Sequence, residues 1–124
     1  MKLVASDLGD RQVIQSYKTG GFRVSGVAFN HSIFVFPKTS IPWSVSRFDR
    51  INESDFKPLR DRASQIDLCL FGCGDRMLPL PKLLNDFLKR FNISGEAMTT
   101  SAACRTYNVL AMEGRSVAAA LICL

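Results

Sequence analysis

The feature that most constrains the fold is the alternation of strand-like and helix-like segments from Ile66 to the end of the chain. The apolar segments 66–71, 93–98 and 116–124 are predicted strands, and a single predicted helix lies in each interval between them. Single helices between strands imply right-handed crossovers, since parallel strands are joined in that way almost without exception. The C-terminal half is therefore predicted to be a β-α-β-α-β unit with a parallel core.

Both predicted helices carry signals for their ends. The second is expected over 99–113, with Gly114 as the C′ residue. The first lies between Pro79/Pro81 and Asn92. Its apolar residues recur at the spacing of one helical face: Leu83, Leu84, Phe87, Leu88 and Phe91.

The first third of the chain has a pattern typical of an antiparallel meander. Residues 12–17 are rich in β-forming side chains and run into the glycine turn 18–21. Side chains over residues 22–29 then alternate with a period of two, which predicts one strand with one face more exposed to solvent. A tight hairpin at 30–31 is expected to lead into a covered strand over 32–36.

The next segment is predicted to be irregular. Pro37 and Pro42 lack backbone donors, so ladder pairing should lapse there. Trp43, the only tryptophan, has two interpretations, a packing plug over the sheet or a binding residue. Further on, an irregular turn at 53–57 is expected to precede a helix to about Ser64.

A length of 124 residues fits one domain over 1–124, and 47% hydrophobic with 22% charged residues is a composition that can bury a core. Sixteen basic and eleven acidic residues give a net charge of +5, which favours an anionic partner. Basic residues alternate with acidic ones, as at 47–50 and 60–62, and no run of Lys or Arg exists. We therefore interpret them as a solvated surface and expect no nucleic-acid partner.

The chain has four cysteines: Cys69, Cys73, Cys104 and Cys123. Their spacing fits neither a zinc site nor a redox pair, and His31 is the only histidine, so no metal and no cofactor is expected. Cys69 and Cys123 fall inside predicted strands, which indicates reduced, buried thiols in an intracellular protein. Residues 1–7 lack the apolar core of a signal peptide, and no apolar run reaches the roughly 20 residues that span a bilayer.

Two short stretches, 72–76 and 100–108, each follow a predicted strand and lead into a helix, and they are predicted to meet in space. The helix end near Thr100 carries unpaired backbone donors that suit an anion. The candidate binding residues of these stretches are Gly72, Gly74, Arg76, Ser101, Cys104, Arg105 and Asn108. In the predicted helix, Ser101, Arg105, Asn108 and Met112 share one side. The packing side is expected to hold Ala102, Ala103, Val109 and Leu110.

Each of these features also has a structural interpretation. Cys104 lies at a helix amino terminus beside Arg105, which lowers a thiol pKa, but the sequence places no general base nearby. It is a weak catalytic candidate, and otherwise a small buried residue. Gly72-x-Gly74 is either half of a phosphate-binding fingerprint or a turn that permits close packing. No carboxylate pair predicts acid–base chemistry.

Several stretches together resemble one known family. They are Ile14–Tyr17, Gly20–Gly26, Phe71–Gly74 with Pro79–Pro81, and Ala103–Leu110. The chain resembles, from residue 11 to 122, the domain-of-unknown-function family that includes mitochondrial respiratory complex I assembly factor three and an adipogenesis-associated vertebrate protein. The resemblance implies a single α/β domain of three layers, with a mixed central sheet, helices and an added β layer. It carries over no catalytic residues.

The resemblance implies a non-enzymatic interaction module that helps to assemble a membrane complex, with a protein partner. Trp43, Arg23 and the rim of the two stretches are its candidate contacts. The alternatives are a small anionic ligand or a thiol enzyme, each using a pocket between the Gly72–Gly74 loop and the helix near Thr100. Without a presequence the chain looks like a bacterial member, cytoplasmic or peripheral to the inner membrane. A eukaryotic member would belong in the mitochondrial matrix.

Overall fold

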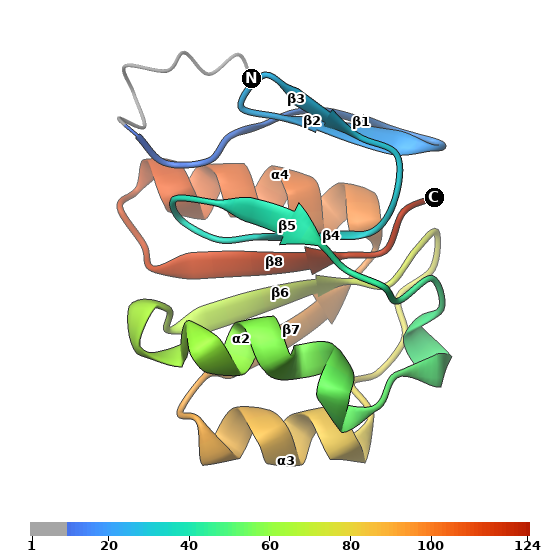
Figure 1. Ribbon diagram of the computed structural model, residues 1–124, viewed down its shortest axis with the longest axis vertical. Coiled ribbons are helices and arrows are strands. Elements are labelled where there is room, and N and C mark those ends of the chain that lie inside the picture. The colour runs from blue at the N-terminus through green and yellow to red at the C-terminus, as the bar shows by residue number, and fades with distance from the viewer. Residues whose placement is uncertain (1–9) are drawn as a thin grey trace.

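The computed structural model describes residues 10–124, so residues 1–7, the stretch without a signal-peptide core, lie outside the described part. Two sheets and three helices make up this part (Figure 1). The helices are α2 (Lys57–Asp61), α3 (Lys82–Arg90) and α4 (Thr100–Met112). Within residues 10–124 no helix combines the length and the apolar character that crossing a membrane requires.

The five-stranded sheet has the order β5-β4-β8-β6-β7. Its strands are β4 (Ile33–Val35), β5 (Ser40–Pro42), β6 (Leu68–Gly72), β7 (Ser94–Met98) and β8 (Val117–Leu121). β6 runs parallel to both β7 and β8, whereas β4 runs antiparallel to β8 and to β5. The predicted β-α-β-α-β unit and the mixed sheet are thus confirmed.

The three-stranded sheet has the order β1-β2-β3, with β1 at Ile14–Lys18, β2 at Gly21–Val24 and β3 at Val27–Phe29. The antiparallel meander is confirmed, but the single strand predicted over 22–29 is wrong. Ser25 and Gly26 have positive φ angles of 46° and 86°, and they turn the chain back on itself between β2 and β3. Period-two alternation continues across such a two-residue turn, so the pattern did not reveal it.

Two further expectations in this region are corrected. The segment 30–31 closes no hairpin, because β3 and β4 belong to different sheets and the chain crosses between them there. Pairing also does not lapse at Pro42, which lies opposite Ile33. β5 is an edge strand, so it needs donors toward one neighbour only, and Trp43 N–H provides the next bond to the Ser32 carbonyl at 2.9 Å.

Residues 53–65 form three short helical pieces. The 3₁₀ turn η2 (Glu53–Phe56) leads into α2, and a second 3₁₀ turn, η3 (Ala63–Gln65), follows it. This matches the expected irregular turn and helix, although α2 ends earlier, at Asp61. Asn52 N–H donates to the Asp55 carboxylate at 2.8 Å and begins the segment.

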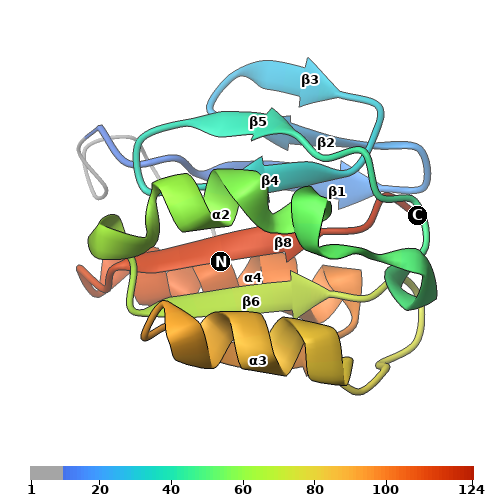
Figure 2. The same cartoon turned by 60° about the horizontal axis from the view of Figure 1, so that its bottom comes forward.

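The five-stranded sheet is the middle of three layers. α2 and α3 lie on one of its faces and α4 on the other, as the rotated view shows (Figure 2). The three-stranded sheet completes the second outer layer, beside α4. Apolar side chains therefore form two clusters, one on each face of the central sheet.

The packing side of α4 differs from the expected one. Its buried residues are Thr100, Ala103, Cys104, Tyr107 and Ala111, whereas Val109 is 41% exposed. Cys123 also follows β8 instead of lying inside it, and it is only half-buried. Gly114, with φ of +82°, ends α4 as predicted.

Candidate functional site

The two stretches singled out in the sequence do meet, and Thr100 joins them. Its N–H donates to the Gly74 carbonyl at 2.9 Å. Its hydroxyl accepts the Gly74 N–H at 2.9 Å and donates to the Ile122 carbonyl at 2.8 Å. One side chain therefore ties the loop after β6, the start of α4 and the chain leaving β8 at the carboxyl edge of the sheet.

This junction is tightly packed. Thr100 is fully buried, and a Cβ atom added at Gly72 would lie 2.9 Å from the Thr100 Cα. Gly72 is therefore needed because two backbones approach each other closely there. These contacts favour the packing interpretation of Gly72-x-Gly74 over the phosphate-loop interpretation.

The amino terminus of α4 uses its own residues as partners. The Thr99 hydroxyl caps the helix by accepting the Ala102 N–H at 3.2 Å. Ser101, at the first turn, is half-buried, and Arg76 in the neighbouring loop is exposed.

The polar side of α4 holds the three-stranded sheet in place. Asn108 Nδ2 donates to the Ile14 carbonyl at 2.8 Å, and Asn108 Oδ1 accepts the Ile14 N–H at 3.0 Å. Arg105 Nη1 donates to the Tyr17 hydroxyl at 2.9 Å. Arg105 and Asn108, both predicted binding residues, thus each form hydrogen bonds with β1, while Arg105 stays exposed.

Cys104 lies among apolar side chains beneath the same helix and is fully buried. Desolvation raises the pKa of its thiol to about 12, against a smaller opposing effect of Arg105. A thiol in this state stays protonated at neutral pH and is closed to substrates, which weighs against catalysis by Cys104.

Arg23 belongs to a different place from the other candidates. It is exposed on β2, where Nη1 donates to the Gly26 carbonyl at 3.0 Å. There it borders a hollow of about 380 Å³ on the three-stranded sheet, together with Lys18 and Gly20.

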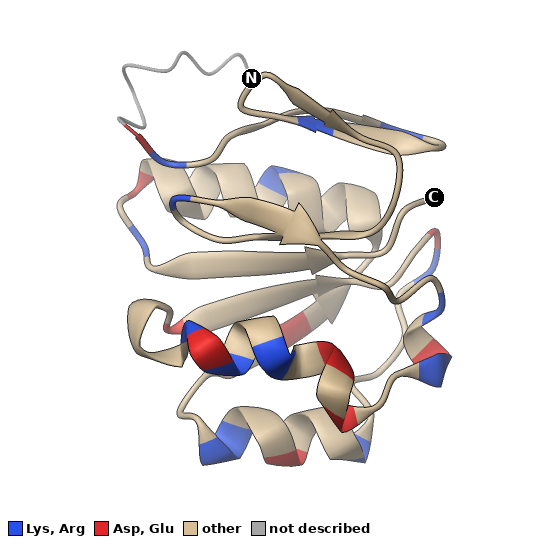
Figure 3. Cartoon of the chain, viewed as in Figure 1, with Lys and Arg blue, Asp and Glu red and all other residues tan. Residues whose placement is uncertain are grey.

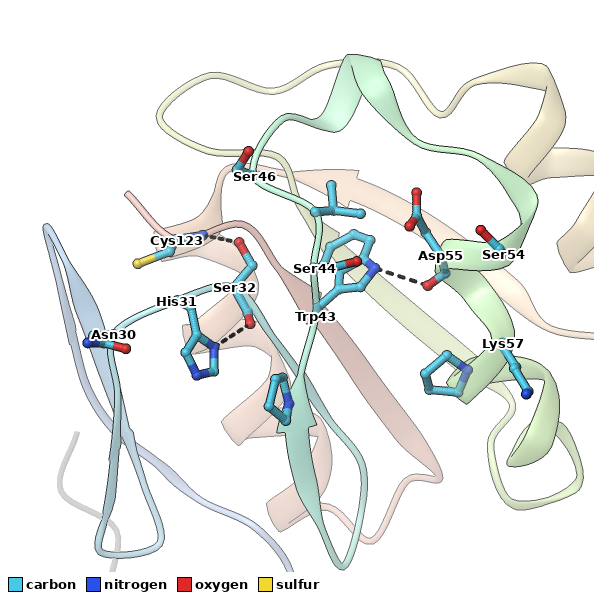
Figure 4. A pocket seen from close by; sticks show the side chains of 13 residues that line it. Asn30, His31, Ser32, Trp43, Ser44, Ser46, Ser54, Asp55, Lys57 and Cys123 are labelled. Atoms are coloured by element: carbon cyan, nitrogen blue, oxygen red, sulfur yellow. Dashed lines mark hydrogen bonds between the residues drawn. The ribbon is translucent and has the colours of Figure 1, made fainter.

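A larger pocket, of about 740 Å³, was not predicted from the sequence. It lies at the end of the central sheet where β5 ends and the chain leaves β8 (Figure 4). Its lining includes Asn30, Ser32, Pro42, Lys57 and Cys123. These residues come from four separate parts of the chain, so no local motif marked the pocket. The only signal in the sequence is the alternation of apolar and polar residues over 43–46, which are alternately buried and exposed in the structure.

Trp43 forms a wall of this pocket and a part of the core at once. The residue is 4% exposed, and the centroid of its ring lies 4.9 Å from that of Phe34. The indole Nε1–H donates to the Asp55 carbonyl at 3.1 Å, as the dashed line in Figure 4 shows. The packing interpretation of Trp43 is thus supported, and the pocket is lined by a rigid aromatic surface.

The single histidine also lines the pocket. His31 Nδ1 lies 2.9 Å from the Ser32 carbonyl, while the Ser32 hydroxyl accepts the Cys123 N–H at 2.9 Å. Across residues 10–124, no three His, Cys, Asp or Glu side chains gather where they would hold a metal ion. The pocket therefore offers apolar contact and a few hydrogen-bonding groups.

Comparison with known proteins gives consistent matches. Residues 14–122 match the family model described as protein of unknown function DUF498/DUF598. The chain is 35% identical over 120 residues to NADH dehydrogenase [ubiquinone] 1 alpha subcomplex assembly factor 3 of Drosophila melanogaster, covering 94% of this chain and 60% of that protein. It is 38% identical over 109 residues to an uncharacterized protein of Rhodobacter capsulatus, covering 88% and 82% of the two chains.

A solved structure is also similar. The crystal structure described as an outer membrane protein from Bartonella henselae superimposes with a TM-score of 0.83 at 33% identity. The match covers 92% of this chain and 96% of that one.

Proposed function

The chain belongs to the DUF498/DUF598 family, the one that its sequence resembles, and on this basis we propose that it is a non-enzymatic protein-interaction module that helps to assemble a membrane-bound respiratory complex. The observation that carries the proposal is its similarity to proteins named as complex I assembly factors. The chain spans about 60% of the length of the Drosophila protein, so the match concerns this domain and the role of the whole relative is extended to it.

The geometry supports binding over catalysis. The residues with the most chemical promise in the sequence, Cys104, Arg105 and Asn108, are buried or bonded within the protein. The pocket of about 740 Å³ is mainly apolar, with Trp43 and Pro42 in its lining. A mainly apolar lining of this kind suits the burial of an apolar side chain of a partner.

The proposal also includes a subcellular location. We propose that a bacterial protein of this kind works in the cytoplasm, peripheral to the inner membrane, and that a mitochondrial one works in the matrix. Its partner is a subunit of the membrane complex or another assembly factor.

Affinity purification from native membranes tests this function. The tagged chain, after mild cross-linking in cells, is expected to enrich subunits or assembly factors of a respiratory complex over an untagged control. A second control carries the tag on an unrelated domain of similar charge. Recovery of no such protein over either control would refute the assembly role.

A further inference from the structure

Two hollows lie on either side of Asn30, which lines both of them. One is the pocket beside Trp43. The other lies on the three-stranded sheet, where Gly20, Gly21 and Ala28 form part of the lining. Asn30 and His31 are both exposed, and they carry the chain from one sheet to the other. The two hollows thus adjoin along one surface.

The hollow on the three-stranded sheet is cationic. Lys18 and Arg23 are exposed at its edge, and neither is in a salt bridge within the described residues. Residues 11–48 contain no Asp or Glu, and Figure 3 shows basic but no acidic residues on β1, β2 and β3. Exposed cations without a counter-charge attract an anionic partner.

The pocket beside Trp43 has a different chemistry. Pro42, Trp43, Val45 and Pro58 give it apolar walls. Asp55 is the only acid in its lining, and its carboxylate already accepts the Asn52 N–H at 2.8 Å. This pocket suits an apolar side chain.

We propose that an acidic segment of the partner protein docks across Asn30, with carboxylates over Lys18 and Arg23 and an apolar side chain in the Trp43 pocket. The proposal rests on the proposed function and names the surface and the chemistry of the partner. A polypeptide fits best, because one segment can offer carboxylates and a single apolar side chain together. Nucleic acid matches the cationic hollow only, and so does an anionic lipid headgroup.

Fluorescence anisotropy with a fluorescein-labelled peptide of glutamate and leucine tests the charge requirement. The protein is expected to bind this peptide and not the same peptide with glutamine for glutamate. The double variant Lys18→Glu/Arg23→Glu should weaken binding by about tenfold or more, and added salt should do the same. The matched double variant Lys82→Glu/Lys89→Glu, on exposed positions of α3, should bind as the unmodified protein does.

Amide shift mapping with the same peptide locates the contact. The largest changes are expected at residues 18–23 and 28–32 and at the Trp43 indole. The docking surface is refuted by any of these results: no peptide binding, equal binding of the glutamine peptide, an equal loss in the α3 variant, or shifts confined to α3. Tighter binding to phosphatidylglycerol vesicles or to a DNA duplex than to the peptide would also refute it.

The affinity purification after cross-linking distinguishes a failure of this docking surface from a failure of the proposed assembly role. If Lys18→Glu/Arg23→Glu recovers respiratory-complex proteins as well as the unmodified chain does, the docking surface is wrong and the assembly role stands. If the unmodified chain recovers none, the assembly role itself fails. Equal melting temperatures of the variants will show that folding is not the cause.

Discussion

At the scale of single residues, Asn108 shows how a side chain can take the place of a neighbouring strand. Its carboxamide both donates to and accepts from the backbone of Ile14, on the free edge of the three-stranded sheet. An open edge is a template for unwanted pairing, and this amide occupies part of it. Asn108, which the sequence suggests as a binding residue, thus joins α4 to β1 in the structure.

We expect Asn108→Ala to lower the free energy of unfolding by about 1–3 kcal/mol, because two backbone groups of Ile14 lose their partner. Urea denaturation measures the change. Asn85→Ala is the matched control, because that exposed amide on α3 makes a single bond of 3.3 Å to the Leu80 carbonyl. Its effect should stay within about 0.5 kcal/mol. Similar losses in the two variants would contradict the role assigned to Asn108.

Thiol labelling examines Cys104 directly. In the folded protein near pH 8, iodoacetamide should modify the half-buried Cys123 first and leave Cys104 intact, since the Cys104 thiol is buried and its pKa is raised to about 12. In urea all four cysteines should react. Mass spectrometry of tryptic peptides gives the rates. Modification of Cys104 at a rate close to that of Cys123 would restore the case for a reactive thiol.

At the scale of elements, the helices and strands of the C-terminal half were predicted from the sequence. For the N-terminal part, only the antiparallel meander was predicted, and not its individual strands and turns. The helix over 82–90 has strong apolar periodicity, and the helix over 100–112 has clear signals at both ends, so their positions came within a residue or two of the expected ones. The turn at Ser25–Gly26 and the strand at 40–42 depend on local φ angles and on which strand has a neighbour. Neither property leaves a clear mark in hydrophobic periodicity.

The candidate site was less predictable than the fold. The sequence indicates which residues lie close together, but it does not indicate whether they leave an open cavity or pack against each other. Thr100 and Gly72 were correctly expected to be close, yet their contact is a packed junction. Whether a polar side chain on α4 faces solvent or another element depends on where the three-stranded sheet folds back. That placement is tertiary and carries no local signature.

We expect Thr100→Val to lower the free energy of unfolding by about 2–4 kcal/mol, because the Gly74 N–H and the Ile122 carbonyl both lose their buried partner. Thr100→Ser keeps the hydroxyl and serves as the control, with a smaller loss from the missing methyl group. Thermal and urea denaturation of the two variants give the comparison. A valine variant as stable as the serine variant would show that these hydrogen bonds contribute little.

At the scale of the whole molecule, the two outer layers have different charge. The three-stranded sheet carries basic residues only, whereas α2, α3 and the turns around them mix both signs (Figure 3). The sequence holds this asymmetry in the acid-free stretch 11–48, and folding gathers residues 14–29 of that stretch into one sheet. The alternating charges further along the chain, at 47–50 and 60–62, concealed it. Two basic residues, Lys18 and Arg23, thus lie on a face without acidic residues, beside the pocket of about 740 Å³.

The most direct test of the central claim, that this chain binds an assembly partner through the surface around Asn30, is site-specific photo-cross-linking in cells. A photoreactive phenylalanine analogue replaces Ala28, which lines the hollow on the three-stranded sheet, or Asn85 on α3 as the matched exposed control. The account predicts that position 28 cross-links to a respiratory-complex subunit or assembly factor and that position 85 does not. Cross-links to such a protein from position 85 alone, or from neither position, would contradict it.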